Sequence, residues 1–175
     1  MRRFGCVPWL PRLPRCERAY ALSSHLMLSL PAAVFLLNLA ATWFMTGLIW
    51  FVQVVHYPLM GGALGDGFAA YHRQHVARTT RIVAPVMLLE LATAALLPWL
   101  RPAEVPVAIA WVGLALVLVA WGSTVLLQIP RHNALAACYA DATHGALCRT
   151  NWIRTIAWSA RAVILLYAAG KVLRS

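Results

Sequence analysis

The sequence predicts an all-α integral membrane protein, a four-helix bundle of four spans with a short amphipathic interfacial helix between spans one and two. Hydrophobic residues make up 62% of the 175-residue chain and charged residues only 11%, whereas ordinary soluble domains carry about 25% charged residues. Four apolar runs are also long enough for membrane-spanning helices, which need roughly 20 residues. A soluble domain so poor in charge could not cover its surface. Disorder is excluded because it requires low hydrophobicity.

The four expected spans are nearly free of charge. The exceptions are Glu90 in the second span and Arg154 and Arg161 in the fourth. Pro58 follows the first span and Pro130 follows the third, and both are expected to mark helix ends because proline has no backbone N–H. The predicted spans are 31–57, 82–100, 105–128 and 153–170.

The segment 1–30 is expected to be a basic cytoplasmic tail preceding the membrane domain, 31–175. Arginines and prolines interrupt it, unlike the continuous apolar run of a signal peptide, and Met27 is an alternative start. Eight basic residues lie on the side of the two termini and six on the opposite side, and the positive-inside rule assigns the more basic side to the cytoplasm of a cell (inner) membrane. The basic residues are scattered, which disfavours nucleic acid as a partner.

The connection after the first span contains four glycines and then a segment with helical amphipathicity, Phe68 to Thr79. Its apolar residues and two histidines recur at helical spacing. We therefore expect a short helix lying in the membrane interface. In the other outer connection, Cys138 and Cys148 are expected to be close enough for a disulfide if that loop is exported.

The histidines gather on one side of the predicted topology, at the outer ends of the helices. Imidazole is the commonest metal ligand and titrates near neutral pH. Three such groups around one ion would suit zinc, copper or iron, and haem is another candidate cofactor. The alternative is that they are ordinary residues of polar interfacial loops. The predicted metal ligands are His56, His72, His75 and His132.

Glu90 and Arg161 are expected to pair, because each lies about eight residues from the outer end of its span. Ionisable residues inside a membrane usually face the bundle interior. One hypothesis is a structural ion pair that fixes helix register. The other is a catalytic pair in a substrate cavity, and we list both residues as candidate catalytic groups. Trp50 could stack on a flat aromatic substrate, although packing explains it equally well.

Two short motifs resemble the anthrone-oxygenase-like family of small four-span membrane proteins. That family ends its third span with Pro-x-Asn-x-x-Leu and begins its fourth with Asn-x-x-Arg-Thr. Pro130 and Leu135 match the first motif, although His132 stands where the family has Asn. The second motif matches at Asn151, Arg154 and Thr155. The match covers only the C-terminal third of the chain. The resemblance implies a membrane-embedded oxidoreductase that acts on a lipophilic molecule, with Asn151 and Arg154 as candidate substrate-binding residues.

Two main functions stay open from the sequence. The first is an oxidoreductase or monooxygenase whose site lies near the outer ends of the helices. The second is a non-catalytic accessory subunit of a larger membrane complex, favoured by the small size and the absence of a strong motif. Transport is a weaker third candidate, because the sequence has no internal repeat. The lipid bilayer is the partner common to all three, and other membrane subunits are partners in the second.

Overall fold

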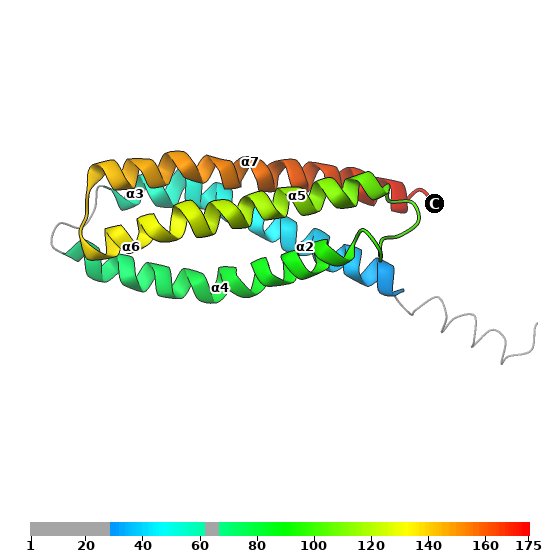
Figure 1. The fold of residues 1–175 in the computed structure, drawn as a ribbon, viewed down its shortest axis with the longest axis horizontal. Helices are drawn as coiled ribbons and strands as arrows, with labels where there is room; N and C mark the ends of the chain where they lie inside the picture. The colour runs from blue at the N-terminus through cyan, green and yellow to red at the C-terminus, as the bar shows by residue number, and fades with distance from the viewer. Residues whose placement is uncertain (1–28, 62–66) are drawn as a thin grey trace, which may run out of the picture.

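The computed structural model describes residues 29–61 and 67–175, and all the regular structure in these ranges is helical (Figure 1). Four long helices run back and forth along one axis. The first comprises α2 (Leu30–Phe51), η1 (Val52–His56) and α3 (Tyr57–Met60), and the second is α4 (Phe68–Leu96). The third comprises α5 (Val107–Ser123), η3 (Thr124–Gln128) and α6 (Ile129–Ala137), and the fourth is α7 (Asp141–Val172).

The bundle is a ring of four helices. α2 packs against α4 and α7, and α5 packs against the same two helices, so α2 and α5 lie diagonally opposite. Three of the helices are long and apolar enough to cross a membrane, namely Leu30–Met60, Phe68–Leu96 and Val107–Ala137. They indicate a membrane protein. The predicted fourth span lies within α7, which is not among those three.

The helices are longer than predicted on the histidine side. At about 1.5 Å per residue, 31 residues extend about 46 Å, which exceeds a hydrocarbon core of about 30 Å. The segment Phe68–Thr79, predicted as a separate interfacial helix, is instead the first part of α4 and continues without a break to Leu96. Only Thr80 and Arg81 separate this segment from the predicted start of the second span, and neither residue breaks a helix. The polar segment and the apolar span therefore form one helix.

Pro58 and Pro130 do not end their helices, contrary to prediction. Each follows a π-helical turn, η1 before Pro58 and η3 before Pro130. The N–H of Tyr57 donates to the carbonyl of Val52, and that of Ile129 to the carbonyl of Thr124. Such wide turns accommodate the missing proline N–H inside a membrane helix. The first and third helices therefore continue to Met60 and Ala137.

The core is layered along the bundle axis. Three apolar clusters contain, in order, Phe35 and Leu165, then Met45 and Trp158, then Phe68 and Leu135. Buried polar residues occupy the two levels between them. We call these levels the Glu90 layer and the Arg154 layer, and their members are described below.

Local hydrogen bonds fix the end of the bundle where α2 begins and the 97–106 connection lies. Ser29 caps α2 by accepting a hydrogen bond from the Ala32 N–H, and Pro31 stands in the first turn, where proline is tolerated. At the same end, Arg101 holds the 97–106 connection by donating to the carbonyls of Pro98 and Val105, each at 2.9 Å. Most of the predicted tail, 1–30, lies outside the described residues.

Candidate functional site

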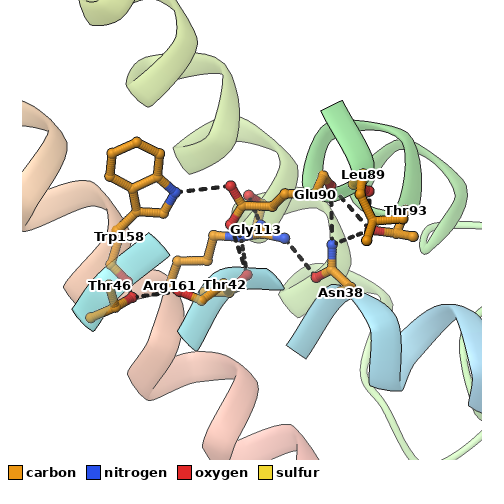
Figure 2. Close-up of polar contacts among 9 residues, drawn as sticks. All are labelled: Asn38, Thr42, Thr46, Leu89, Glu90, Thr93, Gly113, Trp158 and Arg161. Atoms are coloured by element: carbon orange, nitrogen blue, oxygen red, sulfur yellow. Dashed lines mark hydrogen bonds and ion pairs between the residues drawn. The ribbon is translucent and has the colours of Figure 1, made fainter. Parts of the chain in front are cut away.

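The Glu90 layer is a buried polar cluster that contacts all four helices (Figure 2). The predicted pairing of Glu90 with Arg161 is confirmed, with Arg161 Nε 3.1 Å from Glu90 Oε1 and both side chains 1% exposed. Thr42 donates to the same oxygen at 2.8 Å, and the Trp158 indole donates to Glu90 Oε2 at 2.9 Å. The other members of the layer are Asn38, Thr93 and the carbonyl of Gly113.

Every charged atom in the Glu90 layer has a partner. Arg161 also donates to Asn38 Oδ1 at 2.6 Å and to the Gly113 carbonyl, and Asn38 donates to Thr93 at 2.8 Å. A buried ion pair is tolerated only when its remaining hydrogen-bonding atoms are satisfied. Glu90 and Arg161 do not line the cavity described below. The geometry therefore supports the structural hypothesis for this pair over a catalytic one.

The Arg154 layer lies about two helical turns along α7 from Arg161. Arg154 donates to Asn151 Oδ1 at 2.9 Å and to the Tyr57 hydroxyl at 3.4 Å. Asn151 in turn donates to Gln53 Oε1 at 2.7 Å. The two residues of the Asn-x-x-Arg motif are thus in direct contact, and α7 joins the first helix through Gln53 and Tyr57.

Arg154 differs from Arg161 in having no carboxylate beside it. Its side chain is 8% exposed, and its partners are the neutral groups of Asn151, Tyr57 and Thr124. Within 29–61 and 67–175, Glu90–Arg161 is the one salt bridge. A buried cation without a compensating anion is costly, and ionisable residues retained inside a membrane therefore usually mark functional sites. Arg154 is therefore suited to hold a group that carries or develops negative charge.

The four predicted histidines converge, as expected, at the end of the bundle. His72 Nε2 lies 3.2 Å from His132 Nδ1, and His132 Nε2 lies 3.0 Å from the Tyr57 hydroxyl. The rings of His56 and His75 stack at 4.2 Å between centroids. Since Arg154 can only donate to Tyr57, the Tyr57 proton is free to bond His132. A continuous hydrogen-bonded path therefore joins Arg154 to His72.

The imidazoles pack as rings and hydrogen-bond partners, and do not surround a common point. In the described part of the chain, no three His, Cys, Asp or Glu side chains are grouped so that they could hold a metal ion. Two imidazole nitrogens, His56 Nε2 and His72 Nδ1, are buried without a hydrogen-bond partner in the protein. Metal binding by His56, His72, His75 and His132 stays a prediction, which metal analysis of the purified protein can test.

A cavity of 260 Å³ lies between the Glu90 layer and the histidines. Its walls are mainly apolar and include Met45, Ile49, Met87, Trp121 and Trp158. Its polar corner is formed by Tyr57, His75, Gln128, His132 and Arg154. An apolar pocket with a few converging polar groups is the usual form of a small-molecule site. π-Helical turns are frequent at functional sites, and η1 and η3 both flank this cavity.

Trp50 does not contribute to the cavity. It lies on the outside of the bundle, 43% exposed, where it packs edge-on against Trp152 and donates to Ser159 Oγ at 2.9 Å. Cys138 and Cys148 are both free thiols, so the structure does not contain the predicted disulfide.

Sequence reasoning missed Tyr57 and Trp121 as site residues. Tyr57 was assigned to a span end, yet it connects Arg154 to His132. The sequence carries no signal for this role, because Met45, Ile49, Gln53 and Tyr57 recur at the i, i+4 spacing of an ordinary α-helix. Nothing in the sequence distinguishes Trp121, whose side chain lines the cavity with its indole nitrogen buried and without a hydrogen-bond partner in the protein.

Comparison with known proteins identifies no relative of this chain. No protein-family model, curated protein or solved structure matches the chain.

Proposed function

We propose that the protein is a membrane-embedded oxidoreductase of the oxygenase type that acts on a small lipophilic molecule in this cavity. The observation that carries the proposal is the uncompensated Arg154 at the polar corner of an otherwise apolar pocket. Such a cation stabilises negative charge that develops during reaction, as oxyanion-stabilising groups do. The motif resemblance around Asn151 and Arg154 supports the same chemistry.

The path from Tyr57 to His72 supports a role in proton removal. A substrate that gives a proton to the Tyr57 oxygen would displace the Tyr57 proton to His132 Nε2, 3.0 Å away. His132 could then pass its Nδ1 proton to His72, 3.2 Å away. The positive charge of Arg154 repels a proton held on His132 and so favours the second transfer. Proton transfer by positioned groups typically contributes about 10² to 10⁴-fold in rate.

The substrate anion held at Arg154 would then be oxidised by dioxygen. In the reaction implied by the resemblance, an activated CH₂ group and O₂ yield a carbonyl group and one molecule of water. Both hydrogens of the CH₂ group leave in the water, and the two oxygen atoms divide between the products. The apolar walls exclude bulk water and strengthen the attraction between Arg154 and the anion.

The test is oxygen uptake by the purified protein in lipid nanodiscs, with a panel of anthrones as substrates. We expect uptake with quinone formation, and a loss of about 10²-fold or more in Arg154→Gln, as for removal of one oxyanion donor. Arg149→Gln is the matched control, since Arg149 is exposed on the same helix and outside the cavity. Equal rates in wild type and Arg154→Gln would refute the proposal. Absence of turnover together with stoichiometric co-purifying subunits would favour the accessory-subunit alternative.

A further inference from the structure

We infer that the ligand enters this cavity sideways from the lipid, through an opening between α4 and the η3–α6 segment; the inference rests on the proposed function. It assigns the ligand to a class, namely a neutral molecule dissolved in the bilayer. A water-borne ligand would instead enter at the end of the bundle. Three features of the cavity wall support the opening.

The first feature is the exposure of the cavity-lining residues. Those contributed by the first helix and by α7 are buried or half-buried, with none exposed. The exposed ones are confined to the two facing elements, Thr80 on α4 and Val125, Ile129 and Asn133 on η3–α6. The wall of the cavity is therefore thinnest where α4 faces η3–α6.

The second feature is the direction in which these residues point. On the other side of α6, Pro130 and Arg131 border a groove shared with α7, so Val125 and Ile129 lie on the side towards α4. On α4, Thr93 bonds Asn38 of α2, which places Thr80 on the side away from α2, towards η3. The rim residues thus face one another across the same gap.

The third feature is that both rims are irregular between two firm contacts. η3 is a wide turn, and Pro85 removes one backbone hydrogen bond from α4. Towards the histidine end, α4 is tied to α6 by Arg73, which donates to the Ala136 carbonyl at 3.4 Å. Towards the other end, Glu90 of α4 is tied into its layer. The opening occupies the interval between these contacts.

The rim chemistry fits a neutral lipophile. The exposed lining residues Thr80, Val125, Ile129 and Asn133 and the neighbouring Ala84 carry no charge. The basic residues that would attract a soluble anion are absent from the lining at this level, where the only charged lining residue in the described chain is Arg154 inside. A lipid-soluble molecule can therefore move from the bilayer to Arg154 without crossing a charged barrier.

The test measures how a thiol inside the cavity is reached, and it needs no turnover. In a chain with its four native cysteines changed to serine, Thr79→Cys places a thiol at a cavity-lining position beside His75, whose Nδ1 lies 3.2 Å from the Thr79 hydroxyl. Protein in nanodiscs is treated with lipid-soluble N-phenylmaleimide or with a sulfonated, lipid-insoluble maleimide. Labelling is followed by mass spectrometry.

We expect the lipid-soluble reagent to label Thr79→Cys much faster than the sulfonated one. Adding Val125→Trp should slow this labelling about tenfold or more by filling the gap, whereas Leu126→Trp should not. Leu126 is the matched control because it adjoins Val125 on η3, is 72% exposed and does not line the cavity. Faster labelling by the sulfonated reagent, no effect of Val125→Trp, or no labelling by either reagent would overturn lateral entry. Because the labelling test uses no substrate, its result does not depend on whether the protein is an oxygenase. The oxygen-uptake assay tests that proposal independently.

Discussion

Removing the charge of Glu90 tests whether the Glu90 layer holds the bundle together. Glu90→Gln keeps the volume of the side chain but leaves Arg161 as an uncompensated cation, 1% exposed. In the wild-type protein the two carboxylate oxygens of Glu90 accept hydrogen bonds from Arg161, Thr42 and Trp158. Glu90→Gln replaces one of these two acceptors with an NH₂ group. Breaking a buried ion pair from one side costs about 3–5 kcal/mol. We therefore expect the free energy of unfolding to fall by that amount.

The magnitude separates loss of charge compensation from loss of a hydrogen bond. Thr42→Val nearly keeps the shape of a fully buried side chain and removes its hydroxyl, which donates to Glu90 Oε1 at 2.8 Å and accepts from Arg161 Nε at 3.0 Å. Single hydrogen bonds within a membrane protein contribute about 0.6 kcal/mol on average, with a maximum of about 1.7. Thr42→Val should thus be clearly milder than Glu90→Gln. If the two variants lose equal stability, the charge on Glu90 contributes nothing beyond hydrogen bonding.

A double-mutant cycle completes the test. Arg161→Met removes the cation and should also cost about 3–5 kcal/mol, because it leaves Glu90 buried and negative. Glu90→Gln combined with Arg161→Met should lose at least about 2 kcal/mol less than the sum of the single losses. Arg161→Met also removes the donors to Asn38 Oδ1 and the Gly113 carbonyl. This loss occurs in both the single and the double variant, so it cancels in the cycle. The assay is unfolding in mixed micelles followed by circular dichroism, and additivity within about 0.5 kcal/mol would refute the coupling.

Three further predictions concern packing, thiols and metal content. Gly113→Ala should destabilise the fold by about 1–3 kcal/mol, because a Cβ there would lie 3.0 Å from Arg161 Nη1; Gly122→Ala, with nothing within 4 Å, should be neutral or slightly stabilising in the same unfolding assay. Cys138 should be alkylated faster than Cys148 at neutral pH, because burial raises the pKa of the Cys148 thiol; the difference should narrow as pH rises, and equal rates throughout would contradict the structure. Elemental analysis and an optical spectrum should detect a bound transition metal or haem if the predicted histidine site is correct, and a metal-free, colourless protein would eliminate that site.

The helices and the buried ion pair could be predicted from the sequence because both follow from the cost of exposing the wrong group to lipid. Apolar runs predict four spans, and three of these lie in helices that are long and apolar enough to cross a membrane. Equal depth in the bundle predicts Glu90 and Arg161 as partners, and they pair. These inferences need only periodicity and length. The continuous helix from Phe68 to Leu96 was missed, because composition changes within it while the backbone does not.

The cavity could not be predicted, because it depends on the two π-helical turns. A wide turn changes the direction of every later side chain on its helix, and this is how Tyr57 and His132 come within 3.0 Å of each other. The prolines after both turns were visible but were interpreted as helix ends. Proline predicts a missing backbone hydrogen bond. Whether the helix ends or widens there depends on the neighbouring helices.

The two arginines of α7 differ in the charge of the groups that surround them. Arg154 and Arg161 are seven residues apart, so they point to the same side of α7 and both are buried. Arg161 pairs with a carboxylate and lies between two apolar clusters, so its charge is compensated within the protein. Arg154 meets only neutral partners and lines a cavity. Both cations are buried, but only Arg161 has a compensating carboxylate. In the proposed function, Arg154 stabilises the negative charge that develops on a neutral ligand during the reaction.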